Sequence, residues 1–359
     1  MKKLSRIRNI CILVLLQLII FPNFGPTNGP APAVAQTPAQ IGKPIELSLN
    51  LVVPPTHPRW IQAMKPWTQE VMKRTGGRVK ITPYFAAALA PFAEAFDAAV
   101  TGAADLTEAF TQSTPGRFPF SAVTGLSPLD KFTPRPSRIL WDIYNKFPEM
   151  RQRYAAAKVL FLESTQASVI LAKTPVRKLE DLKGMKILTD APWGVKRLKL
   201  LGASGVGMPF GEAYGSLQTG VIDGIICSES PALGRKFFEI AKFATQMNPV
   251  GYVPLVVAMN QNTWKKLPKD IQEKIEEVSG DYAVDLFDKA GVAHEKDART
   301  QSIEKFGVEY ITLPKDEIAR WNKLDAPIQQ EFAAELESKG LPGKKLVAEF
   351  NSLLDKYSH

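Results

Sequence analysis

The chain has 359 residues, with 45 Lys and Arg against 36 Asp and Glu, and it contains two cysteines. The net charge of +9 is moderate and comes without basic runs interleaved with aromatic residues, a composition that argues against nucleic-acid binding. A chain of this length can bury a core in each of two domains.

The first 35 residues are predicted to be a signal peptide. Four basic residues lie among the first eight, and an apolar run of about a dozen residues follows from Ile10 to Phe21. Ala33-Val34-Ala35 matches a cleavage site, so the mature chain is expected to begin near Gln36. An uncleaved N-terminal anchor is the alternative, whereas no lipid-attachment motif precedes Cys11. Removing residues 1–35 lowers the net charge by four and leaves Cys227 without an internal disulfide partner.

The first hundred mature residues alternate between predicted strands and helices. Strand-like segments have apolar residues at every second position, and helix-like segments have them at every third or fourth. The expected order is strand 45–53, helix 60–71, strand 78–81, helix 92–100 and strand 104–110. This alternation predicts a mainly parallel sheet flanked by helices.

A second set of such segments follows residue 159. Strands are expected at 169–172, 186–189, 221–227 and 253–260, with a helical turn at 179–184 and helices at 195–201 and 212–219. One long helix is then predicted from Pro268, because Ile271, Ile275, Val278, Tyr282 and Leu286 share a helical face. From Pro314 the chain reads as mostly helical. Two α/β units predict two lobes around a ligand cleft that closes on its solute.

Residues 207–224 carry a distinctive motif, Met-Pro-Phe-Gly-Glu-x-Tyr-x-x-Leu-Gln-Thr-Gly-x-x-Asp-Gly. This motif resembles the solute-binding proteins of tripartite ATP-independent periplasmic (TRAP) transporters, the DctP family. Further segments resemble that family in the same order along the chain, namely 76–79, 92–105, 115–119, 179–187, 237–242 and 260–268.

The resemblance implies a periplasmic, monomeric, non-enzymatic protein that captures a small organic solute and delivers it to the small and large subunits of a membrane permease. It implies an α/β fold of the periplasmic-binding-protein type, with mostly parallel sheets. Residues 43–165 and 253–292 are expected to form lobe I, and residues 166–252 and 293–359 lobe II. No cofactor is implied. The alternative function is that of a ligand-binding subunit in a periplasmic sensor system.

Three expected pocket positions depart from the family pattern. Leu188 stands where the family places an arginine that pairs with a solute carboxylate. Ser168 occupies the position of a second arginine found in members that bind acidic sugars, and Cys227 that of an asparagine. Because a buried carboxylate without compensating donors costs several kcal/mol, either another cation replaces the arginine or the solute is not a simple carboxylate.

The remaining site candidates are cations and aromatic residues. Arg117, Lys196 and Arg197 are the possible replacement cations, although for each residue taken alone the favoured interpretation is a solvated charge on a loop or helix face. Trp193 is either a platform for a flat solute or an inter-lobe packing residue, and Phe210 is expected to be a pocket wall by resemblance. We therefore expect a solute that is less acidic and more apolar or aromatic than a dicarboxylate.

An enzyme that uses Cys227 as a nucleophile is the competing class of function. Such an enzyme needs a base close to the thiol, and neither His57 nor His294 lies near Cys227 in the sequence. The two histidines also lack the spacing of a metal-binding motif, so the sequence predicts no metal site.

Overall fold

The computed structural model describes residues 43–114, 116–189 and 191–358. The predicted signal peptide, residues 1–35, lies outside this range. None of the helices in the described part of the chain is long and apolar enough to cross a membrane.

The first sheet has five strands in the spatial order β2-β1-β3-β10-β4. Their bounds are β1 Ile45–Asn50, β2 Val79–Tyr84, β3 Leu106–Phe110, β4 Lys158–Ser164 and β10 Pro254–Met259. β1 pairs in parallel with β2 and β3, while β10 runs antiparallel between β3 and β4. Every residue of β10 is buried, because helices cover both faces of the sheet at this interior strand.

The second sheet has six strands in the order β11-β9-β5-β8-β6-β7. Their bounds are β5 Val169–Ala172, β6 Lys186–Leu188, β7 Ser204–Val206, β8 Gly224–Cys227, β9 Phe243–Thr245 and β11 Glu309–Ile311. β6 pairs in parallel with β7 and β8, and β5 is the antiparallel strand between β8 and β9. Two mixed sheets with mostly parallel order confirm the predicted α/β fold class.

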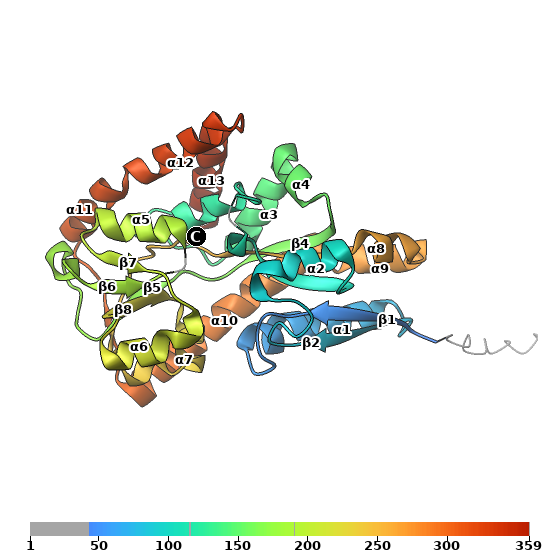
Figure 1. Ribbon diagram of the computed structural model, residues 1–359, viewed down its shortest axis with the longest axis horizontal. Coiled ribbons are helices and arrows are strands. Elements are labelled where there is room, and N and C mark those ends of the chain that lie inside the picture. The colour runs from blue at the N-terminus through green and yellow to red at the C-terminus, as the bar shows by residue number, and fades with distance from the viewer. Residues whose placement is uncertain (1–42, 115, 190, 359) are drawn as a thin grey trace, which may run out of the picture. The chain divides into compact units, whose positions relative to one another are not determined.

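Short helices lie in the crossovers of both sheets (Figure 1). Those that follow first-sheet strands are α1 Lys65–Arg74, α2 Ala95–Thr101, α3 Pro136–Lys146, α4 Pro148–Tyr154, α8 Gln261–Lys266 and α9 Lys269–Glu277. Those that follow second-sheet strands are α5 Pro192–Leu200, α6 Ala213–Thr219, α7 Glu229–Gly234 and α11 Lys315–Asp325. α6 ends as predicted at Gly220, whose φ of 79° is the left-handed conformation that closes a helix.

The predicted long helix after Pro268 is in fact two helices. α9 ends at Glu277, and α10 (Gly280–Phe306) begins three residues later. Between them Val278 is buried and its carbonyl oxygen accepts a hydrogen bond from Trp67 Nε1 at 2.9 Å. This bond takes the Val278 carbonyl out of the helical ladder, and Gly280 has a φ of +50°. Tyr282, predicted to share the buried face, is 43% exposed.

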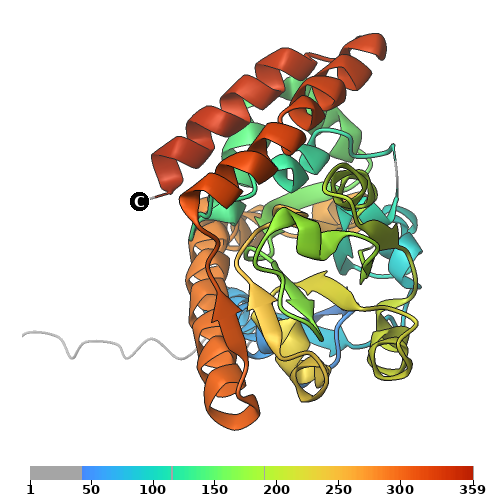
Figure 2. The ribbon, with the colours of Figure 1, turned by 90° about the vertical axis from the view of Figure 1, so that its left-hand side faces the viewer.

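α10 connects the two sheets. Its 27 residues are about 40 Å long at the usual helical rise. It contacts α3 and β4 of the first sheet and also α7, which follows β8 of the second sheet. Figure 2 shows α10 as one long helix beside the strands of the second sheet.

The segment 293–359, expected to lie in lobe II, divides its contacts between the two sheets. β11 and α11 belong with the second sheet, where Ile311 and Trp321 are part of one apolar core. The helices α12 (Pro327–Ser338) and α13 (Gly343–Tyr357) instead pack against α3 and the 3-10 turn at Ser121–Leu126, in the core of the first sheet (Figures 1 and 2). The assignment of residues to two lobes stays a prediction. The contacts of α12 and α13 do not favour their expected place in lobe II.

Candidate functional site

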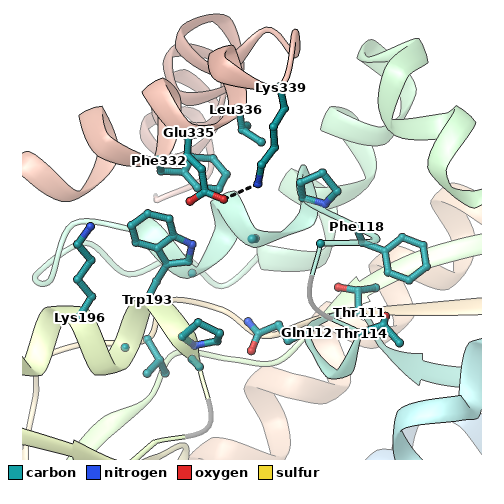
Figure 3. A pocket seen from close by; sticks show the side chains of 18 residues that line it. Thr111, Gln112, Thr114, Phe118, Trp193, Lys196, Phe332, Glu335, Leu336 and Lys339 are labelled. Carbon is teal, nitrogen blue, oxygen red and sulfur yellow. Dashed lines mark hydrogen bonds and ion pairs between the residues drawn. The ribbon is translucent and has the colours of Figure 1, made fainter.

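A cavity of about 370 Å³ opens beyond the carboxyl ends of β3 and β6 (Figure 3). Ligands of α/β proteins bind at such strand ends, and pockets for small organic molecules have volumes of this order. The walls come from the loop after β3, the start of α5, the crossover at Val250 and one face of α12. The lining residues are Thr111, Gln112, Thr114, Gly116, Phe118, Pro119, Ala122, Gly125, Ala191, Pro192, Trp193, Gly194, Lys196, Val250, Phe332, Glu335, Leu336 and Lys339.

Aromatic and aliphatic side chains form most of the cavity wall. Trp193, in the first turn of α5, meets Phe332 of α12 edge to face, with ring centroids 5.6 Å apart. Phe118 on the facing loop is held by stacking on Tyr154 at 4.3 Å. The arrangement suits a flat apolar solute group, because aromatic rings attract one another in offset and edge-to-face geometries.

A glycine allows α5 to start at the cavity floor. A Cβ atom on Gly194 would lie 2.7 Å from both Thr189 Oγ1 and Val250 Cγ1. A side chain at this position would therefore push α5 away from the crossover at Val250 and move Trp193 with it.

The charged groups that line the cavity are Lys196, Glu335 and Lys339, and each is in an ion pair. Lys339 Nζ lies 2.6 Å from Glu335 Oε1, and about half of each side chain is exposed. Lys196 pairs with Glu331 of α12, and its Nζ is 5.0 Å from the centroid of the Trp193 ring. Exposed pairs contribute only about 0.2–1 kcal/mol, so a solute could replace either partner.

Arg197, one of the predicted replacement cations, has a structural role. Its side chain is fully buried and donates from Nε and Nη2 to the two carboxylate oxygens of Asp325, both at 2.7 Å. It also donates to the carbonyl oxygens of Gly125, Ser127 and Pro249. With every face of the guanidinium occupied by protein, Arg197 is not available to a solute in this conformation.

Arg117 is also occupied by protein groups. Its Nη1 lies 2.6 Å from Asp97 Oδ1, and its guanidinium lies over the rings of Phe96 and Phe118 at 4.6 and 5.4 Å. Its neighbours Gly116 and Phe118 line the cavity, so Arg117 fixes the loop that carries that wall.

The three predicted mismatch positions lie at the same end of three adjacent interior strands of the second sheet, β5, β8 and β6. Val169, which follows Ser168, pairs with Cys227 across β5 and β8, and Leu188 pairs with Ile225 across β6 and β8. All three side chains are buried. Leu188 and Cys227 belong to an apolar cluster that Phe210 joins from its rim, and the backbone N–H of Ser168 donates to Asn248 Oδ1 at 3.1 Å. None of these four residues lines the cavity of Trp193, and their role as solute contacts stays a prediction.

Phe210 and Cys227 have surroundings that the sequence did not reveal. Phe210 packs edge to face on Phe237, and the guanidinium of Arg235 lies 5.0 Å from its ring centroid. Burial raises the pKa of the Cys227 thiol well above its usual value, which keeps it protonated and a poor nucleophile.

A second, smaller pocket contains polar residues that the sequence analysis set aside. His57 and His294 both line it, together with Arg59, Glu163 and Glu295, in a volume of about 40 Å³. The sequence could have indicated this pocket. A Pro-Pro pair ends the first predicted strand just before His57, and functional groups lie at the ends of strands. Within the described residues, no group of three or more His, Cys, Asp or Glu side chains is arranged to hold a metal ion.

The ionisable groups in this pocket are buried, and burial shifts the pKa values of several of them. Arg59 Nη1 lies 2.5 Å from Glu163 Oε2 and 3.7 Å from Glu108 Oε1, and burial raises the pKa of Glu163 well above its usual value. Burial also lowers the pKa of His57 to about 3 and that of His294 to about 4, so both imidazoles are neutral at pH 7. Burial and the neighbouring Glu229 raise the pKa of Glu295 to about 8.

Comparison with known proteins gives consistent matches. Residues 49–336 match the model of the DctP family, described as bacterial extracellular solute-binding protein, family 7. A curated relative, the C4-dicarboxylate-binding periplasmic protein DctP of Rhodobacter capsulatus, is 30% identical over 183 residues, which are 49% of this chain and 53% of the relative. The chain thus spans about half the length of that relative.

Solved structures extend the likeness over most of the chain. A TRAP periplasmic solute-binding protein from Bordetella bronchiseptica, with bound (R)- and (S)-mandelate, has a TM-score of 0.78 at 25% identity over 87% of this chain and 99% of that one. A TRAP solute-binding protein from Rhodoferax ferrireducens, in complex with benzoate, shares the fold with a TM-score of 0.81 at 24% identity over 88% and 98% of the two chains.

Proposed function

Because this chain belongs to family 7 of the bacterial extracellular solute-binding proteins, we propose that it is the solute-binding subunit of a TRAP transporter. In this role it captures a small organic solute in the periplasm and delivers it to the membrane permease subunits, without catalysing a reaction. The family match supports this transport role over the sensor role that the sequence left open.

The observation that carries the proposal is the cavity between Trp193, Phe332 and Phe118. It lies at the carboxyl ends of strands from both sheets, which is the expected place for a solute in an α/β protein. Its wall is mostly apolar, and in the described structure its charged lining consists of half-exposed side chains in ion pairs, Lys339 with Glu335 and Lys196 with Glu331 of α12.

The solute class that fits this wall is an aromatic or otherwise apolar organic acid. Leu188 offers no charge at the position where the family pattern has an arginine, and Arg197 is committed to Asp325. Within the cavity, a dicarboxylate would have to displace both Glu335 from Lys339 and Glu331 from Lys196 to compensate its two charges, whereas a monocarboxylate needs one such exchange. The mandelate complex of the Bordetella bronchiseptica protein is a precedent for an aromatic acid on the same fold.

The test is a binding screen of the mature chain by thermal shift, followed by isothermal titration calorimetry. Mandelate and benzoate are the aromatic acids, and succinate, malate and galacturonate are the acidic alternatives. We expect saturable binding of at least one aromatic acid with a single site. Tight binding of succinate or malate, with no aromatic acid bound, would contradict the proposed solute class.

Lobe closure is the second part of the proposal. A solute that binds the closed state more tightly than the open state shifts the population toward closure. Small-angle scattering of the mature chain should therefore give a smaller radius of gyration with saturating solute. An unchanged radius with a ligand shown by calorimetry to bind tightly would contradict closure.

A further inference from the structure

The cation that receives the solute carboxylate can be identified from how tightly each basic side chain near the cavity is held. Arg197 is fully buried in a bidentate pair, and Arg117 is fixed by Asp97 and two aromatic rings. Both would lose several protein contacts on turning toward a solute. This inference rests on the proposed function and concerns the same cavity.

Lys339 is held more weakly than either arginine. It follows the last turn of α12, its side chain is 51% exposed, and among the described residues its ammonium group contacts one carboxylate, that of Glu335 four residues earlier. Figure 3 shows Lys339 extending from α12 toward Glu335 and the ring of Trp193. Lys196 lies on the other side of that indole ring in the same view.

We propose that Lys339 binds the carboxylate of an aromatic monocarboxylic acid in exchange for Glu335, while the ring of the acid packs on Trp193 and Phe332. Glu335 is 50% exposed and loses little when its carboxylate turns to water. The new pair is stronger than the old one, because the solute excludes water from the cavity and a lower local dielectric strengthens the attraction.

A hydroxyl group on the facing wall offers a second contact. Thr114 Oγ1 is buried and has no hydrogen-bond partner among the residues that the structure describes. Thr114 lines the cavity on the loop after β3, opposite α12 (Figure 3). A buried hydroxyl without a partner is costly, so a rotation of the Thr114 side chain that turns Oγ1 toward an oxygen atom of the solute would be favourable.

The exchange predicts opposite effects for the two partners of the ion pair. Lys339→Gln removes the cation and should weaken binding of a carboxylate, whereas Glu335→Gln frees Lys339 and removes a like charge, and should tighten it. A zwitterionic solute would behave differently, because its ammonium group would use Glu335 and both substitutions would weaken binding. The control is Lys344→Gln, which removes the same charge from an 82% exposed lysine paired with Glu337.

The experiment is isothermal titration calorimetry of the four proteins with mandelate, benzoate and the neutral isostere benzamide, at low and at moderate salt. For the acids at low salt we expect Lys339→Gln to bind about tenfold more weakly, Glu335→Gln a few-fold more tightly and Lys344→Gln within twofold of the unaltered protein. Added salt should reduce these differences, and benzamide should show none of them.

Two results would overturn the inference and are distinguishable. If the unaltered protein binds neither acid, both the proposed solute class and the role of Lys339 are wrong. If it binds an acid and Lys339→Gln binds that acid equally well, the solute class stands and the assignment of Lys339 alone is wrong. Weaker binding of the acids by Glu335→Gln would also exclude the exchange.

Discussion

The indole ring of Trp193 and the phenyl ring of Phe332 meet edge to face with centroids 5.6 Å apart, and they join α5 to α12 across the cavity. One residue follows a strand of the second sheet and the other belongs to a helix in the core of the first sheet. The cavity wall therefore depends on a contact between segments that are more than a hundred residues apart in the chain.

Replacing Trp193 with Ala should weaken the binding of an aromatic acid about tenfold, or ~1.4 kcal/mol, because the solute ring loses its stacking surface. Calorimetry with mandelate measures the effect. Phe132→Ala is the control, since Phe132 is 40% exposed and does not line the cavity. Equal affinities of the unaltered protein and the Trp193 variant would assign Trp193 to packing alone.

Replacing Arg197 with Met should lower the free energy of unfolding by about 3–5 kcal/mol, because the Asp325 carboxyl group is left in a buried site without its partner. Urea unfolding measures the loss. The double variant Arg197→Met, Asp325→Leu removes both charges and should recover much of it. A stable single variant that had lost only its affinity for solute would instead place Arg197 in solute binding.

Replacing Leu188 with Arg tests whether the mismatch position contacts solute or core. Leu188 is fully buried in an apolar cluster, so we expect the arginine to lower the free energy of unfolding by several kcal/mol. Leu188→Met keeps the volume and should cost less than about 1.5 kcal/mol. If Leu188→Arg were as stable as the unaltered protein and bound succinate, Leu188 would face the solute, as the family pattern implies.

The stability of the protein should fall as the pH rises from about 7 to 8.5. The folded-state pKa of Glu295 is raised to about 8, so between its unfolded value of 4.5 and pH 8 the folded state binds more protons than the unfolded state. Stability from this group is fully present below pH 4.5 and is lost as the pH rises through 8. The depressed pKa values of His57 and His294 act only below about pH 6.5, where stability rises with pH.

Urea unfolding at several pH values separates these contributions. Glu295→Gln should be more stable than the unaltered protein at pH 8.5 and should show a shallower decline above pH 7. Glu304→Gln, on the same helix α10, is the control because it removes one carboxylate from an exposed site. Parallel pH profiles for Glu295→Gln and the unaltered protein would show that Glu295 does not titrate in this range.

The order of strands and helices was readable from the sequence because period-two and helical patterns are local. The break at Val278 was not, because the hydrogen bond from Trp67 that draws its carbonyl out of the helix comes from 211 residues away. Trp193 was recognised as either a solute platform or a packing residue, and its place in the cavity wall supports both readings. The sequence analysis missed Phe332, Glu335 and Lys339, because the pattern of a surface helix does not show which cavity the helix borders.

The packing of α12 and α13 has a consequence for how the protein forms. Tyr357 Oη donates to Asp142 Oδ2 across 215 residues, and α13 supplies Phe350 and Leu354 to the same core as α3. In a chain that emerges amino end first, the apolar face of α3 lacks its contacts with α13 until the last residues follow. Folding that depends on such distant contacts is slow, so we expect residues 136–146 to need protection, by a chaperone or by transient local pairing, until the carboxyl end of the chain is available.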